Sequence, residues 1–113
     1  MFSNSLIFKP MGGGVRISKD TAIRRTRLFI TQKLHSNLRK IHSDDRALIL
    51  HLLVTRFGFT PSELTNAFPW SRSTIYEGIK NGAWMESNLK SRLIKPRIDS
   101  FLSYLLYNDR YIN

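Results

Sequence analysis

The most constraining feature of the sequence is a pair of helix starts placed close together, at Thr60 and Ser71. Thr60 can serve as an N-cap, Pro61 is preorganised for the first helical position, and Glu63 completes a Thr-x-x-Glu capping box. The helix that begins here must stop before Pro69, because proline clashes with the preceding turn of a continuing helix. The sequence therefore predicts two short helices with a tight connection between them.

The second of these helices is expected to run from Ser71 to Asn81 and to end at Gly82. Ile75 and Ile79 lie one helical turn apart, so they share a face and are expected to pack on the preceding helix. The other faces are nearly all polar and carry Arg72, Ser73, Tyr76, Glu77 and Lys80. Aliphatic anchors inside and hydrogen-bonding groups outside are typical of a recognition helix in the major groove of DNA.

Upstream of this pair, the most apolar stretch of the chain predicts a central core helix. Ser43 can cap its start, and Gly58 can close its end in a left-handed conformation. Ala47–Val54 is apolar nearly all round apart from His51, which is expected to be a buried histidine and not a metal ligand. With the two short helices, this helix is expected to form a trihelical helix-turn-helix core over residues 43–83.

A longer basic helix is predicted over residues 18–42, where Ser18 or Asp20 can cap the start. Its apolar side chains recur at spacings of 7, 4, 4 and 3 residues, and they are Ile23, Ile30, Leu34, Leu38 and Ile41. The basic residues lie mostly off this stripe. They form either a solvated charged face or a face that contacts phosphate.

Residues 84–113 are expected to form a C-terminal helical packing or oligomerisation segment, in which Pro96 breaks or restarts a helix. An amphipathic stripe follows the proline and consists of Ile98, Phe101, Leu102 and Leu105. Tyr104, Leu106 and Tyr107 add apolar surface on further faces. The stripe either forms a subunit contact or covers the core of a monomer.

The charge of the chain is high and unevenly distributed. Lys and Arg number 18 against 8 Asp and Glu, which gives a formal net charge of +10. Residues 1–43 carry nine basic groups and one acid, residues 44–86 four and five, and residues 87–113 five and two. Residues 1–17 include a proline and three consecutive glycines and are expected to form a flexible basic arm. This pattern predicts a polyanionic partner held mainly by the two flanks.

These features favour an all-α, sequence-specific, double-stranded DNA-binding regulator of transcription. The expected base contacts are Arg72, Ser73, Tyr76, Glu77 and Lys80, with Arg72 placed to bond both acceptors of a guanine. The expected phosphate contacts are Ser71, Thr74, Arg24, Arg25, Arg27, Lys90 and Arg92. Because one recognition helix reads too few base pairs, a homodimer or a partner regulator subunit is also expected.

The segment Ser71-Arg-Ser-Thr-Ile-Tyr-Glu-Gly-Ile-Lys-Asn-Gly82 resembles the recognition helix of bacterial and phage helix-turn-helix regulators, including AlpA-type prophage activators and excisionases. The span Leu48–Gly82, about a third of the chain, is similar to the trihelical DNA-binding unit of sigma-factor region 4. The resemblance implies duplex binding through the third helix by a bacterial, phage or plasmid protein.

Two positions depart from this pattern. Thr65 stands where such units usually have a small residue, often alanine, and Pro69 stands where they have a glycine with positive φ. Proline cannot adopt that φ, so the turn is expected to take a different geometry.

Two other functions remain open. One is an excisionase-like or architectural factor that bends DNA. The other is a protein-interaction module, such as an antitoxin or adaptor, which the near-neutral residues 44–86 favour.

Several classes of protein are not expected. The chain has no cysteine, and no nucleophile with a paired base can be assembled, so enzymatic activity is not expected. No metal, cofactor or small-molecule ligand is indicated. No apolar run approaches the ~20 residues that span a bilayer, and we expect a cytoplasmic location.

Overall fold

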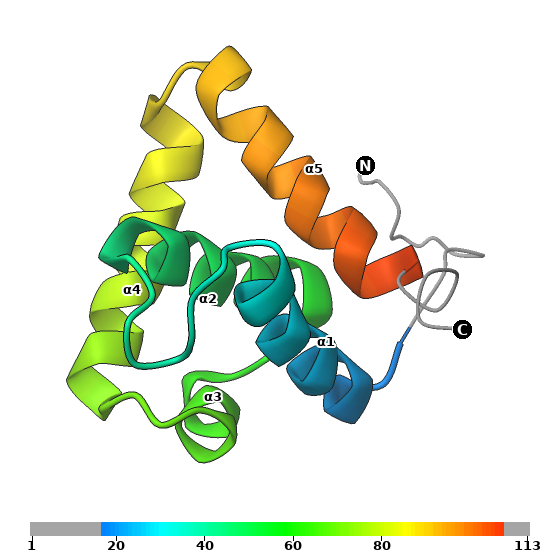
Figure 1. Cartoon of the computed structure of the whole chain (residues 1–113). Coiled ribbons are helices and arrows are strands. Elements are labelled where there is room, and N and C mark those ends of the chain that lie inside the picture. Colours follow the sequence, from blue (N-terminus) through cyan, green and yellow to red (C-terminus); the bar gives the residue numbers. More distant parts are fainter. Residues whose placement is uncertain (1–16, 108–113) are drawn as a thin grey trace.

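The computed structural model describes residues 17–107, which form five helices and no strand (Figure 1). In chain order these are α1 (Lys19–Gln32), α2 (Ser43–Phe57), α3 (Pro61–Ala67), α4 (Arg72–Asn88) and α5 (Ser91–Tyr107). The expected all-α class is confirmed. All but the last residue of the expected arm over residues 1–17 lies outside the described residues.

Helix α2 is the centre of the molecule, as its apolar sequence predicts. Leu50, Leu52 and Leu53 are completely buried in it, and α4 packs along most of its length. Helices α4 and α5 diverge from their junction like the two arms of a V, and α2 contacts both of them (Figure 1). The short α3 packs on α4, while α1 packs on α5. The core therefore lies between the two arms of the V.

Helix α1 is shorter than the expected helix over residues 18–42. Ser18 is its N-cap and accepts a hydrogen bond from the backbone N–H of Thr21, but the helix ends at Gln32. His35 has a φ of 51°, in the left-handed region that closes helices, and Ser36 N–H donates to the carbonyl of Ile30. The expected continuous helix is therefore wrong beyond Gln32.

The apolar spacing that suggested the longer helix still marks packed residues. Ile41 is buried, and Leu34 and Leu38 pack against the core from the irregular segment 33–42. The apolar residues of the predicted stripe therefore pack on the core, the first ones from α1 and the others from the non-helical segment that follows it.

The ends of α2 and α3 are set by local signals in the sequence. The N-cap of α2 is His42, one residue before the expected Ser43, and its Nδ1 accepts from Asp44 N–H at 3.1 Å. Gly58 closes α2 in the expected left-handed conformation, with a φ of 74°. The predicted capping box of α3 is confirmed, since Thr60 and Glu63 each accept a hydrogen bond from the backbone N–H of the other.

Helix α4 does not end at Gly82 but continues to Asn88. Gly82 is buried against α2, where an added Cβ would lie 2.3 Å from the carbonyl oxygen of Ala47 and 2.5 Å from Cβ of His51. The glycine therefore allows α2 and α4 to approach closely. The expected helix end at Gly82 is therefore wrong, and the glycine is a packing residue.

Helix α5 likewise passes through Pro96, where a break or restart was expected. The stripe that follows faces the interior of the chain. Three of the four expected oligomerisation residues, Ile98, Phe101 and Leu105, are buried within the monomer, and Leu102 packs against the core. Of the two possibilities left open by the sequence, the stripe covers the core of the monomer.

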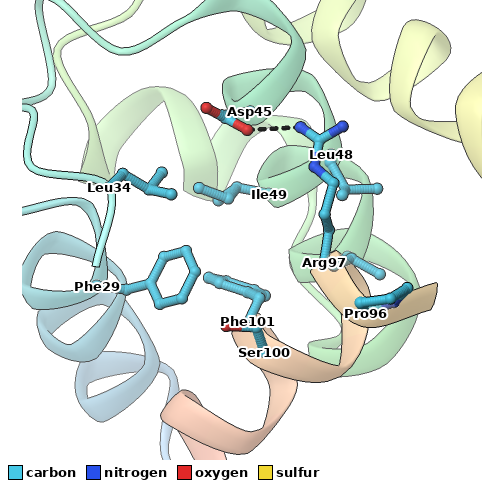
Figure 2. A pocket seen from close by; sticks show the side chains of 10 residues that line it. Phe29, Leu34, Asp45, Leu48, Ile49, Pro96, Arg97, Ser100 and Phe101 are labelled. Carbon is cyan, nitrogen blue, oxygen red and sulfur yellow. Dashed lines mark hydrogen bonds and ion pairs between the residues drawn. The ribbon is translucent and has the colours of Figure 1, made fainter. Parts of the chain in front are cut away.

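A small cavity of about 220 Å³ lies where α1, α2, α5 and segment 33–42 meet (Figure 2). Its lining is mainly apolar, with the rings of Phe29 and Phe101 5.2 Å apart between centroids. Arg97 on α5 pairs with Asp45 on α2 at 2.5 Å beside the cavity (Figure 2). This ion pair joins the two helices at the edge of the core.

Candidate nucleic-acid interface

The outward face of α4 carries the five side chains expected to contact bases. Arg72, Ser73, Tyr76, Glu77 and Lys80 are all exposed, whereas Ile75 and Gly78 on the same helix are buried. Tyr76 keeps 48% of its surface exposed. The Cζ atom of Arg72 lies 5.9 Å from the centroid of the Tyr76 ring, within cation–π distance. The helix thus has one anchored face and one polar face, as the sequence predicts.

The start of α4 is built by hydroxyl groups. Ser71 is the confirmed N-cap and accepts from Thr74 N–H at 3.2 Å. Its own hydroxyl donates to Thr74 Oγ1 at 2.9 Å, and Ser73 Oγ lies 3.3 Å away. The exposed end of a 17-residue helix presents the positive pole of its dipole beside these oxygens. The arrangement favours a negatively charged group near this end.

The connection between α3 and α4 avoids positive φ. Phe68 has φ −127° and ψ 151°, and the positive-φ residues in the described chain are His35 and Gly58, neither of which lies in this connection. Proline at position 69 is compatible with such extended backbone. The different turn geometry expected from Pro69 is confirmed.

Trp70 is buried in this connection and not an exposed stacking residue. Its ring stacks on Phe68 with centroids 5.0 Å apart, and its Nε1–H donates to the carbonyl oxygen of Leu38 at 2.6 Å. From the other side, Arg27 donates to the carbonyl of Ala67 at 2.5 Å and lies over the Phe68 ring. These contacts fasten the start of α4 to segment 33–42 and to α1.

The residues expected to contact phosphate do not gather on one surface. Arg25 is buried, and its guanidinium donates to the carbonyl of Leu105 at 2.6 Å, so its assignment as a phosphate contact is wrong. Arg24 is exposed on α1, while Lys90 and Arg92 are exposed at the junction of α4 and α5. That junction lies at the opposite end of α4 from Ser71, about 25 Å away for a helix of this length.

Two basic residues of the predicted helix over residues 18–42 lie close to the start of α4, although they are not among the named phosphate contacts. Arg39 and Lys40 are exposed in segment 33–42, and together with Arg27 and Pro69 they line a cleft of about 470 Å³. They were placed on a continuous helix, which spread them along its polar face. The signal that was available is Asn37, a turn-forming residue whose side chain can bond the backbone two residues on.

A second cleft, of about 370 Å³, lies on another side of α4 beside the start of α2. Asp44 and Glu77 contribute negative charge to it and Arg46 a positive charge. The charged residues that line the first cleft are therefore all basic, whereas those that line the second sum to a net negative charge.

Two ion pairs join neighbouring helices of the described chain. Lys19 on α1 bonds Glu63 on α3 at 2.9 Å, and the hydrogen bond from Thr60 N–H, reinforced by Lys19, lowers the pKa of Glu63. Glu86 on α4 accepts hydrogen bonds from Arg56 on α2, which is the main reason that its pKa falls to about 2.

His51 is buried as expected, and its Nε2 lies 2.5 Å from Glu86. Within residues 17–107, no cluster of three histidines or acids is arranged to hold a metal. None of the helices in this described part is long and apolar enough to cross a membrane.

Comparison with known proteins gives no match for this chain, whether to a protein-family model, to a curated protein or to a solved structure.

Proposed function

We propose that this protein binds double-stranded DNA in a sequence-specific manner and regulates transcription. The observation that carries the proposal is the outward face of α4, where five polar side chains are exposed on a helix anchored by Ile75 and Gly78. In this proposal α3 and α4 act as a helix-turn-helix unit, and α4 enters the major groove.

In this mechanism Arg72 contributes most to the preference for one DNA sequence over others. Its guanidinium can donate to both N7 and O6 of one guanine, and a good bidentate contact contributes about 1–3 kcal/mol of discrimination. Glu77 lies on the same exposed face and can accept from the amino group of a cytosine. Affinity comes mainly from phosphate contacts, so binding weakens steeply with salt.

The test is selection of bound duplexes from a random DNA pool at physiological salt. We expect an enriched motif, and Arg72→Ala is expected to lower the preference for that motif by about 5- to 150-fold. Arg92→Ala is the matched control, because it removes the same charge from an exposed position at the other end of α4. It is expected to leave the sequence preference unchanged.

Two other outcomes would contradict the proposal. Tight, salt-sensitive binding without an enriched motif would support an architectural factor, and a gel assay for DNA bending would then test it. No binding to duplex DNA would support a protein-interaction module. A palindromic motif would indicate a two-fold dimer, whose contact must involve residues other than the buried Ile98, Phe101 and Leu105.

A further inference from the structure

Segment 33–42 returns from the end of α1 to the connection between α3 and α4 (Figure 1). The hydrogen bond from Trp70 Nε1 to the Leu38 carbonyl, 2.6 Å long, fixes it there. The cleft that results is lined by Arg27, Thr31, Asn37, Leu38, Arg39, Lys40 and Pro69. We call this the basic cleft.

The charge in the basic cleft is of one sign. Arg27, Arg39 and Lys40 are exposed cations, and the described residues that line the cleft include no acid. The cleft beside the start of α2 contains both Asp44 and Glu77. An anion near the start of α4 is therefore attracted to the basic cleft, whereas Asp44 and Glu77 repel it from the cleft beside α2.

Arg39 and Lys40 stand on a preformed turn. The side-chain oxygen of Asn37 accepts from the backbone N–H of Arg39 at 2.9 Å and from that of Lys40 at 3.0 Å. Ile41, the next residue, is buried in the core. Backbone that is ordered before binding loses less entropy when its side chains meet a ligand.

We propose that the basic cleft binds the phosphodiester backbone of the DNA strand that borders the groove entered by α4. Arg39 and Lys40 contact phosphate in this inference, and Trp70 is a positioning residue that holds their turn beside α4. The inference rests on the proposed function, because it places the backbone contact relative to α4.

The experiment measures the dissociation constant for the selected duplex and for a scrambled duplex between 50 and 200 mM salt. Each phosphate contact adds about 0.9 to the slope of log affinity against log salt. Arg39→Ala is therefore expected to weaken binding to both duplexes equally, and its deficit relative to wild type should shrink by about 3.5-fold over this salt range. Lys40→Ala should behave in the same way.

Lys95→Ala is the charge-matched control. Lys95 is exposed in the first part of α5, at the opposite end of α4 from the basic cleft, and it pairs there with Asp99. We expect it to leave the slope unchanged. If Arg39→Ala and Lys95→Ala give the same slope as wild type while the motif is still selected, the inference is overturned and the proposed function stands. If the wild type binds no duplex, both fail.

Trp70→Phe tests the positioning role, since phenylalanine can keep a ring on Phe68 but lacks the N–H that bonds Leu38. At a temperature where the variant is folded, we expect weaker binding and a reduced slope although no charge is removed. An unchanged slope would overturn the positioning role of Trp70.

A free phosphate compound could occupy the basic cleft in place of the DNA backbone, because both carry the same anionic group. If inorganic phosphate shifts the amide NMR signals of Arg39 and Lys40 while the DNA slope does not depend on them, the cleft binds a small phosphate compound and the inference is overturned.

Discussion

Helices α4 and α5 have the same length of 17 residues, and each continues through a residue that ordinarily ends a helix. In α4 this residue is Gly82, and in α5 it is Pro96. The contact with α2 requires the glycine, because an added Cβ would lie 2.3 Å from a backbone oxygen of α2. Pro96 is exposed, and the helix continues past it because the residues beyond it are buried. A helix-ending residue inside a helix thus allows close packing in α4, whereas in α5 it only weakens the helix locally.

The largest expected effect concerns the buried stripe that holds α5 in place. Phe101 is 1% exposed, and its ring meets that of Phe29 edge-on at 5.2 Å. Phe101→Ala is expected to lower the free energy of unfolding by about 3–5 kcal/mol, from lost burial and the cavity left behind. Leu93→Ala, on the same helix but 58% exposed, should change it by less than about 0.5 kcal/mol. Urea unfolding measures both, and equal effects would mean that this stripe does not hold α5.

The role of glycine in α4 is tested by two identical substitutions. Alanine gains about 1 kcal/mol of helix propensity at either position, and overpacking costs about 1–3 kcal/mol or more. At Gly82 the new Cβ meets backbone of α2 at 2.3 and 2.9 Å, which places the overpacking cost at about 3 kcal/mol. After the gain in helix propensity is subtracted, we expect Gly82→Ala to destabilise the fold by about 2 kcal/mol. At Gly78 the closest atom, at 2.5 Å, is the end of the Leu50 side chain, which can move. Gly78→Ala should therefore cost clearly less, and stabilisation by both variants would contradict the packing role of Gly82.

The sequence predicts this fold well where a signal is local and less well where tertiary contact decides. The capping box at Thr60, the left-handed Gly58 and the N-cap Ser71 each depend on a few adjacent residues, and all three are confirmed. The end of α1 depends on His35, which adopts the left-handed conformation although the usual signal for it at a helix end is a glycine. The continuation of α4 depends on how close α2 comes to Gly82, which no local pattern reveals.

The residues of the candidate site also divide into those that the sequence predicts and those that only tertiary contacts reveal. The exposed face of α4 follows from helical periodicity, so its residues could be named in advance. Buried Arg25 could not be recognised, because the carbonyl that it bonds, that of Leu105, lies 80 residues away in the chain. Arg39 and Lys40 lie beside α4 through tertiary contacts of segment 33–42, namely the burial of Ile41 and the hydrogen bond from Trp70 to Leu38.

Replacing the proline inside α5 is expected to stabilise the fold. Pro96 cannot donate a hydrogen bond to the carbonyl four residues earlier, and an interior proline costs a helix about 3 kcal/mol. Proline also restricts the unfolded chain, which offsets about 0.4–1 kcal/mol of this. We expect Pro96→Ala to raise the free energy of unfolding by about 2 kcal/mol. Pro61→Ala, at the compatible first position of α3, is the control and should lower it slightly; a loss of stability in both would show that Pro96 fits its site.

The smallest expected effect concerns the part of α4 beyond Gly82, which an ion pair fastens to α2. The carboxylate of Glu86 faces Arg56 and His51, and the hydrogen bonds from Arg56 are the main cause that lowers its pKa to about 2. A pKa lowered in the folded state stabilises the fold above the unfolded value, near 4.3, and this contribution is lost as the pH falls towards 2. Because 28% of the side chain is exposed to solvent, we expect a contribution of about 1 kcal/mol.

The measurement compares wild type with Glu86→Gln in urea at pH values from 5 to 2. Other carboxylates titrate in both proteins, so the difference between their free energies of unfolding isolates Glu86. This difference should be constant near pH 5 and disappear progressively below about pH 4. Glu77→Gln, on the exposed face of the same helix, should give a difference close to zero throughout. A difference for Glu86→Gln that does not change with pH would mean that its charge does not hold the end of α4, and that burial of Met85 suffices to extend the helix past Gly82.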